Sequence, residues 1–309
     1  MRKLTIAVLL MIAVRVSAQE SVGESVALPF LDQVRSAKSA GSAGVMAVAR
    51  PDAYSHFGNV AQSVFSEEKA MASVSYGLWQ PEVSNTNIFS ASGMCRVNDD
   101  LSMTFGVSSS LYGEERKYDD FGLESANMYP VDLIAGVGAA YKILDYLSFG
   151  LALNYVMSKD FSGTLNAFSA DVEVAFRKKG IDVSLSACNL GPKVKDAAGI
   201  GWNLPMNARL NAGYGFYFGK SMLYGAVQGQ YYFGGPSSVH GGVALEYEWN
   251  RMISFRAGFN GGSKKNGIPT CAAAGISLTL KSFSVDFAYS LMASGPMKNS
   301  LACGVGYSF

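Results

Sequence analysis

Charged side chains at alternate positions of otherwise apolar runs are the residues of this sequence best placed to do chemistry. These candidate lining residues are Asp171, Glu173, Arg177, Arg209, Glu246, Glu248 and Arg256. Carboxylates and guanidinium groups form strong hydrogen bonds with one another or with a polar ligand. Two interpretations therefore stay open: the groups neutralise each other across an interior, or they line a route or docking site for a ligand.

Groups that would support catalysis or bind a metal are sparse. The two histidines, His56 and His240, have no carboxylate or cysteine at the spacing of a metal site. No nucleophile elbow, phosphate-binding loop or dinucleotide fingerprint occurs, and Gly136-Val137-Gly138 lies inside an alternating run. We therefore expect polar packing from the histidines, and no enzyme activity, metal or cofactor.

The elements that position the charged residues alternate between apolar and small or polar residues. In the run from Tyr146 to Val156, apolar side chains take every second place, starting at Leu147. Because side chains of a strand point alternately to opposite faces, this period predicts a strand with one apolar face. Similar runs are Ile181–Ala187, Ala208–Phe218, Val243–Trp249, Ile253–Phe259 and Phe283–Leu291. Runs of about ten residues are long enough for tilted strands to cross a bilayer.

Short and long connections alternate along the chain. Short turns, such as Val97–Asp100 and Gly219–Lys220, separate longer polar loops. The expected loops are Tyr112–Pro130, Ser158–Thr164, Gly191–Leu204, Gly234–Val239, Gly261–Thr270 and Ala293–Asn299. About fourteen runs result, with both chain ends and every short turn on one side. The sequence thus predicts an all-β fold, a transmembrane antiparallel β-barrel with its short turns in the periplasm.

A soluble β-sandwich is the alternative fold. It would require polar outward faces, whereas one face of each run here is too apolar to lie in water. The candidate lining residues are in register with small residues on the other face. On this lumen-facing side they avoid the destabilisation of about 2–4 kcal/mol that a basic residue causes when it faces the middle of the lipid.

The cysteines are far apart in sequence and none belongs to a closely spaced pair. They are Cys95, Cys188, Cys271 and Cys303. We interpret them as small residues of the barrel wall, and the sequence leaves open whether opposed cysteines form a disulfide in an oxidising compartment.

The first residues have the form of a secretory signal peptide. Met1-Arg2-Lys3 precedes the apolar run Leu4–Val14, and Val16-Ser17-Ala18 offers a cleavage site. We expect residues 1–18 to be removed, residues 19–66 to form an N-terminal segment and residues 67–309 to form the barrel. Three of the 25 basic residues lie in the leader, so the mature chain carries 22 against 24 acidic residues. We therefore expect no binding to nucleic acid.

Small residues dominate the N-terminal segment before Arg50-Pro51-Asp52-Ala53. Because small residues permit close approach of the backbone, we expect a plug-like or luminal segment held inside or against the barrel. The alternative is a flexible periplasmic tail. The candidate motif residues of this segment are Arg35, Gly41, Gly44, Asp52 and Asn59.

The chain ends in an alternating run from Leu301 to Phe309. Its apolar face repeats the pattern of the earlier runs and fits the strand that closes a barrel in lipid. The terminal Phe309 and Tyr307 resemble the signal by which outer-membrane barrels are recognised for insertion.

Several stretches resemble a known family. Residues 35–37, 40–45, 51–53 and 59 resemble the opening of the PorV/PorQ branch of FadL-like outer-membrane proteins, which belong to the type IX secretion system of Bacteroidetes. Further similar stretches are Asn189–Lys193, Leu204–Leu210, Glu246–Trp249, Phe255–Phe259 and Lys298–Leu301. The similarity spans the mature chain and is nearer to the PorV type. Two departures are Val60, where the family usually has proline, and a shorter chain, which implies trimmed loops.

The resemblance implies an outer-membrane barrel that accepts the C-terminal domains of exported cargo from the translocon and passes them to the surface attachment complex. Its partners would be outer-membrane lipid, these secretion proteins and the cargo. Specificity would lie in the long loops, particularly Tyr112–Pro130 and Gly191–Leu204. The alternative function is a FadL-like channel for hydrophobic small molecules, in which the N-terminal segment is a plug and the lumen holds a lipid or detergent-like ligand.

Overall fold

Strands with an apolar outward face and a polar inward face build this protein. The computed structural model describes residues 26–45, 50–79, 85–119, 121–161, 163–196, 198–235, 237–262, 270–293 and 299–309. On strand β14 (Ser238–Trp249), alternate residues from Ser238 to Glu248 are buried, and those from Val239 to Trp249 are exposed. Such an arrangement suits a strand between lipid and a polar lumen. The expected signal peptide, residues 1–18, lies outside the described residues.

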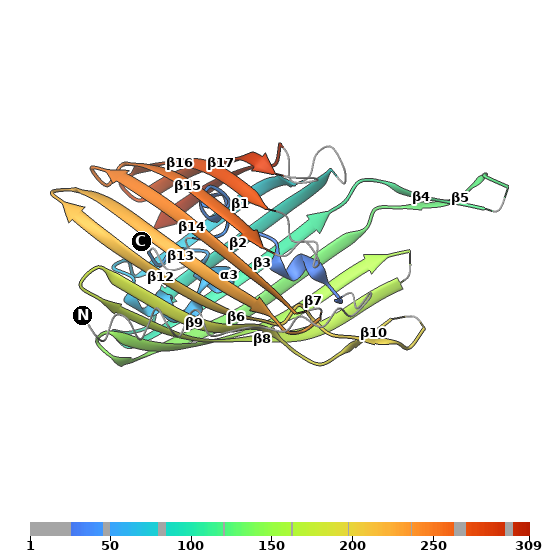
Figure 1. Ribbon diagram of the computed structural model, residues 1–309, viewed down its shortest axis with the longest axis horizontal. Coiled ribbons are helices and arrows are strands. Elements are labelled where there is room, and N and C mark those ends of the chain that lie inside the picture. Colours follow the sequence, from blue (N-terminus) through green and yellow to red (C-terminus); the bar gives the residue numbers. More distant parts are fainter. Residues whose placement is uncertain are drawn as a thin grey trace.

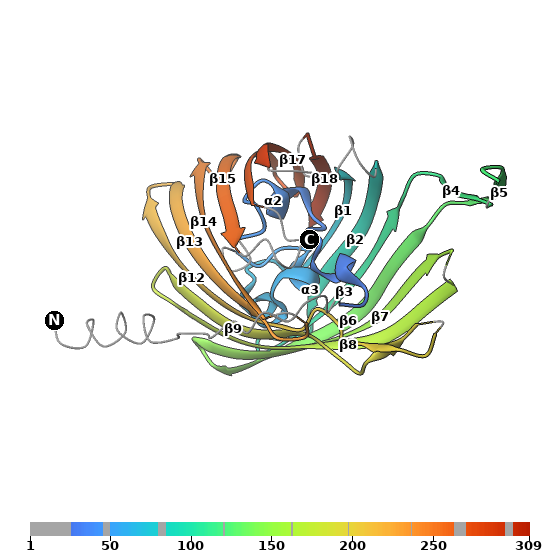
Figure 2. The ribbon, with the colours of Figure 1, turned by 45° about the vertical axis from the view of Figure 1, so that its right-hand side comes forward.

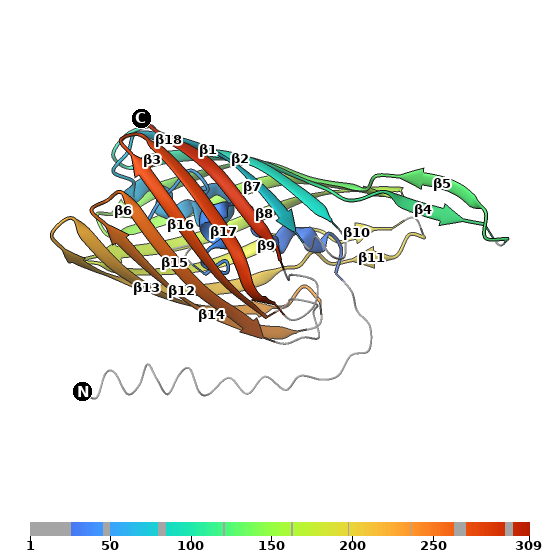
Figure 3. The same cartoon turned by 90° about the horizontal axis from the view of Figure 1, so that it is seen from above.

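Within the described residues, fourteen strands close into one antiparallel barrel (Figure 1), which confirms the predicted fold class. The last strand pairs with the first, with Leu301 opposite Leu78 and Tyr307 opposite Ala72, and this pairing closes the barrel (Figure 3). The other barrel strands besides β14 are β1 (Ala70–Trp79), β2 (Thr86–Arg96), β3 (Leu101–Leu111), β6 (Val131–Leu144), β7 (Leu147–Asp160), β8 (Gly163–Lys178), β9 (Ile181–Leu190), β12 (Asn207–Phe218), β13 (Ser221–Tyr232), β15 (Ile253–Gly262), β16 (Cys271–Leu280), β17 (Phe283–Ala293) and β18 (Leu301–Ser308).

Two of the expected long loops contain hairpins. Strands β4 (Glu115–Tyr118) and β5 (Glu124–Met128) form an arm that projects beyond the barrel, and β10 (Val194–Lys195) pairs with β11 (Gly201–Trp202) at the same end (Figures 1 and 3). The expected loop Ser158–Thr164 is wrong: the β7 and β8 strands continue through most of it, and Ser158 pairs with Leu165. The strand pattern was hidden there because residues beyond the lipid need no apolar face.

The N-terminal segment lies inside the ring of strands (Figure 2). Two of its short helices begin at side-chain caps: at α2, Ser36 Oγ accepts a hydrogen bond from Ser39 N at 3.0 Å, and at η2, Asn59 Oδ1 accepts one from Gln62 N at 3.2 Å. The segment comprises the 3₁₀-helices η1 (Pro29–Asp32) and η2 (Val60–Phe65) and the α-helices α2 (Ala37–Ala40) and α3 (Ser55–Gly58). Within the described residues, no helix is both long enough and apolar enough to span a bilayer.

Apolar side chains of the segment pack against the inner wall at separate places. Around η1, Phe30 and Leu31 join Ile134 of β6, Val156 of β7 and Leu204 in one buried cluster. Helix α2 lies against β16, β17 and β18, whereas η2 lies against β3, β6, β7 and β8. The wall therefore holds the segment from opposite sides of the lumen.

Candidate functional site

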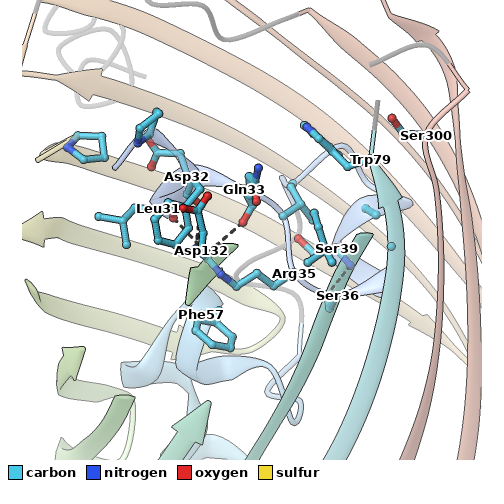
Figure 4. A pocket seen from close by; sticks show the side chains of 18 of the residues that line it. Leu31, Asp32, Gln33, Arg35, Ser36, Ser39, Phe57, Trp79, Asp132 and Ser300 are labelled. Atoms are coloured by element: carbon cyan, nitrogen blue, oxygen red, sulfur yellow. Dashed lines mark hydrogen bonds between the residues drawn. The ribbon is translucent and has the colours of Figure 1, made fainter. Parts of the chain in front are cut away.

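A cavity of about 1020 Å³ lies between the N-terminal segment and the inner faces of the strands near the long connections. In Figure 4, Asp32, Gln33 and Arg35 of the segment lie on one side of this cavity, and Trp79 and Ser300 of the wall lie on the other. Pockets of about this volume hold small molecules in other proteins. The cavity is therefore our candidate functional site.

The side chain of Arg35 organises the part of the segment that borders the cavity. Its guanidinium donates hydrogen bonds to the backbone carbonyls of Phe30, Leu31 and Gln33, at 3.0 to 3.1 Å. The same group lies over the ring of Phe57, 5.0 Å from the ring centroid. Burial lowers the pKa of Arg35 to about 10, and the nearby Asp32 opposes the shift. This arginine ties helix η1 to the region of helix α3.

Asp32 connects the segment to the opposite wall. Its Oδ1 accepts hydrogen bonds from the side-chain amides of Asn189, at 3.2 Å, and Asn207, at 3.4 Å. Burial raises the pKa of Asp32 to about 6, whereas the guanidinium of Arg209 and that of Arg35 oppose this shift. The predicted lining residue Arg209 and the predicted motif residue Arg35 thus face the same carboxyl group.

Three other candidate lining residues lie together on β14 and β15. Arg256 Nε lies 2.6 Å from Glu246 Oε2, and Nη1 of the same arginine donates to Ser277 Oγ at 2.5 Å. Glu248 accepts a hydrogen bond from Arg50 of the N-terminal segment at 2.9 Å. Neutralisation across the interior accounts for these charges, because each carboxylate has a basic partner.

The candidate lining residues of β8 are divided between two places. Asp171 accepts hydrogen bonds from Asn154 Nδ2 at 3.1 Å and from the backbone of Asn189 at 2.7 Å, and Glu173 accepts one from the backbone of Ala61 at 3.1 Å. Arg177 is apart from both and forms an ion pair with Asp182 at 3.2 Å, next to the short turn after β8. The pairing register of β8 and β9 shifts between Ala170 and Val172, so Asp171 has no directly opposite residue on β9.

The remaining candidate motif residues shape the N-terminal segment itself. A Cβ on Gly41 would lie 2.8 Å from the Cα of Gly275, so only glycine permits this approach to β16. Gly44 has a φ of +81°, which other residues rarely adopt. Asp52 accepts a hydrogen bond from Tyr54 N at 2.8 Å and lies 3.5 Å from Lys38, and Asn59 caps η2. Gly44, Asp52 and Asn59 border the cavity. The contacts described here shape the N-terminal segment, and the one charged group among them, Asp52, is paired with Lys38.

His56 connects the segment to two wall strands. Its Nδ1 lies 3.1 Å from Thr104 Oγ1 on β3, and its Nε2 lies 2.9 Å from Asn154 Oδ1 on β7. Burial lowers the pKa of His56 to about 4, so the imidazole is neutral at pH 7. The expected role in polar packing therefore extends to anchoring the segment.

His240 of β14, from which only polar packing was expected, also lines the cavity. Three uncharged residues of β13 and β15 that the sequence does not mark line it as well, and they are Gln228, Gln230 and Asn260. The alternation places each on the inward face, but scattered uncharged residues carry no sequence signal that distinguishes a binding wall from an ordinary lumen.

Other predicted features lie away from the cavity. Tyr307 packs edge to face against Phe283 and Phe309, with centroids 4.7 and 4.6 Å apart, at the short-turn end. All four cysteines lie in described strands, and none is in a disulfide; Cys95 and Cys303 are exposed on the outer face. Among the described residues, no three metal-binding side chains gather into a site.

Solved structures share this fold at low sequence identity. One is the CymD monoaromatic hydrocarbon channel, with a TM-score of 0.62, 12% identity and coverage of 88% of this chain and 96% of the other. A FadL homologue of Pseudomonas aeruginosa has a TM-score of 0.60 at 10% identity, with 90% and 99% covered. The toluene transporter TodX of Pseudomonas putida also has 0.60 at 10%, with 88% and 97% covered. No family model and no curated protein matches the sequence.

These comparisons define the fold as that of FadL-like outer-membrane channels. They do so over nearly the full length of each channel, in agreement with the fourteen-stranded closed barrel. The fold therefore indicates an outer-membrane barrel.

Proposed function

We propose that this protein is an outer-membrane passage for hydrophobic small molecules. The observation that carries the proposal is the cavity inside a barrel of FadL-like fold. Leu28, Phe30, Trp79 and Trp202 supply apolar and aromatic surface to its lining. The channels with this fold that are named for monoaromatic hydrocarbons and toluene support the same class of cargo.

Narrowing the cavity tests this function. Gly77 lines the cavity, and a Cβ there would meet only Ile88 and a backbone oxygen, at 3.7 and 3.8 Å. A Gly77→Phe variant should therefore assemble while filling part of the space. Gly229→Phe is the matched control, because Gly229 is exposed on the wall and no atom lies within 4 Å of its added Cβ.

The assay is uptake of radiolabelled toluene by cells that produce each variant in an otherwise impermeable outer membrane. We expect wild type and Gly229→Phe to raise the uptake rate equally, and Gly77→Phe to raise it less. The variants are compared at equal amounts of protein in the outer membrane. If wild-type cells took up toluene no faster than cells without the protein, the proposal would be rejected.

A secretion role of the PorV type is the second candidate. Two observations favour it: the resemblance of residues 35–59 and later stretches, and the β4–β5 arm, whose Phe121 and Leu123 are 89% and 67% exposed. Large exposed apolar side chains on a projecting arm suit a protein partner. If this role is correct, deleting residues 115–128 should lower surface display of type IX cargo while leaving toluene uptake intact. Unchanged display would remove this candidate.

A further inference from the structure

Four buried polar atoms without hydrogen-bond partners face the cavity from one part of the wall. They are Nε of Arg209, Oε1 of Gln228, Nδ1 of His240 and Oδ1 of Asn260, and none has a partner among the described residues. All four side chains line the cavity. The exposed fractions of Gln228 and His240 are only 8% and 2%. We call these four residues the polar patch.

The sheet register brings the members of the polar patch together. Arg209 of β12 lies opposite Gln230 of β13, and Gln230 lies opposite His240 of β14. In the neighbouring row, Gln228 lies opposite Gly242, which lies opposite Asn260 of β15. The patch therefore occupies two adjacent rows across four neighbouring strands.

Buried polar groups are normally paired, because an unpaired one loses its hydrogen bonds to water without replacement. The patch offers two amide oxygens that accept hydrogen bonds and an arginine nitrogen that donates one. His240 Nε2 lies 3.1 Å from Ser238 Oγ, so its Nδ1 donates or accepts according to the tautomer. A ligand that complements the patch must both donate and accept.

The charges around the patch favour an uncharged ligand group. Arg209 repels an ammonium group, and the acceptor oxygens of Gln228 and Asn260 repel a carboxylate. The nearby carboxyl of Asp32 partly offsets the charge of Arg209. A hydroxyl or primary amide group avoids both conflicts.

We propose that the polar patch binds the uncharged, hydrogen-bonding head of an amphipathic ligand, an alcohol or a primary amide, while its hydrocarbon part occupies the apolar side of the cavity. The inference deepens the proposed function and rests on it for the route by which the ligand enters. Unmodified hydrocarbons would bind the cavity without engaging the patch.

Ligands that differ only in their head group test the proposal. The probes are octanamide, octan-1-ol, octane, octanoate and octylammonium, added to the full-length mature protein in lipid nanodiscs. Trp79 and Trp202 line the cavity and report binding by fluorescence, in a Trp249→Phe background because Trp249 faces outward. We expect octanamide and octan-1-ol to bind more tightly than the other three. Equal affinity of octane and octanamide overturns the proposal, as does tighter binding of either ion.

Two variants locate the effect. Gln228→Leu and Asn260→Leu each remove an acceptor, and each should weaken octanamide binding roughly 2- to 13-fold relative to octane binding in the same variant. Asn211→Leu is the control, because Asn211 lies opposite Gln228 in the same row but does not line the cavity. An equal loss in the control overturns the assignment to the patch, and the wild-type head-group comparison stands even if a variant fails to fold.

Failure of this inference and failure of the proposed function give different results. If head groups make no difference but toluene uptake still depends on Gly77, the patch is rejected and the passage stands. If octanamide is preferred but uptake is independent of the protein, the passage is rejected and the patch stands as a binding site only.

Discussion

Substituting Gly150 by alanine should loosen the N-terminal segment from the barrel wall. Gly150 lies on the inner face of β7, and an added Cβ would be 2.5 Å from the backbone nitrogen of Ala61 and 2.8 Å from its Cα. The backbone of helix η2 must therefore move. Two hydrogen bonds hold Ala61 at this place, one from Ser148 Oγ to its carbonyl at 2.6 Å and one from its nitrogen to Glu173 at 3.1 Å.

The expected cost follows from the crowding. Overpacking of this kind destabilises by about 1–3 kcal/mol, which includes the backbone shift that would weaken these two hydrogen bonds. A net cost of about 1–3 kcal/mol would raise the population of the undocked segment roughly 5- to 150-fold.

Hydrogen exchange measured by mass spectrometry on residues 55–66 checks this prediction. Exchange should accelerate by that factor in Gly150→Ala, and toluene uptake should rise as the segment leaves the lumen. Gly229→Ala is the control, because its added methyl group meets nothing within 4 Å. Wild-type exchange rates in a correctly assembled Gly150→Ala barrel would refute the reasoning.

Three further predictions concern anchoring and assembly. Because the pKa of docked His56 is about 4 and that of a free imidazole about 6.5, docking is at full strength above pH 6.5 and weakens by up to about 3 kcal/mol as the pH falls to 4. Hydrogen exchange of residues 55–66, corrected for its intrinsic pH dependence, should therefore accelerate between pH 6.5 and 4. In His56→Gln this acceleration should be absent. Glu248→Gln should accelerate hydrogen exchange around Arg50, because it weakens the hydrogen bond to Arg50 and lowers the free energy of docking by about 0.5–2 kcal/mol. Glu114→Gln is the control: it removes an exposed ion pair with Arg116 beside the β4–β5 arm and should not change this exchange. Deleting Phe309 should lower the amount of assembled barrel in the outer membrane, and normal levels would argue against its role in insertion.

The strands and their faces were predictable from the sequence. Alternation is a local property, so Leu147 and Phe149 were assigned to the lipid face, and Glu246 and Arg256 to the lumen, without knowledge of any partner strand. The polar extension of β7 past Met157 was missed for the same reason, since a strand outside the lipid loses the apolar signal.

The grouping of inward side chains was decided only by the tertiary structure. Arg177 and Arg209 have the same sequence signature, yet one pairs with Asp182 by a turn and the other faces the cavity. Which inward residues meet depends on the stagger of distant strands and on where the N-terminal segment docks, through contacts such as Gly41 with Gly275. The sequence by itself determined a barrel with a polar interior. The closed ladder and the docked segment determined where that interior is empty, because register and packing are relations between residues far apart in the chain.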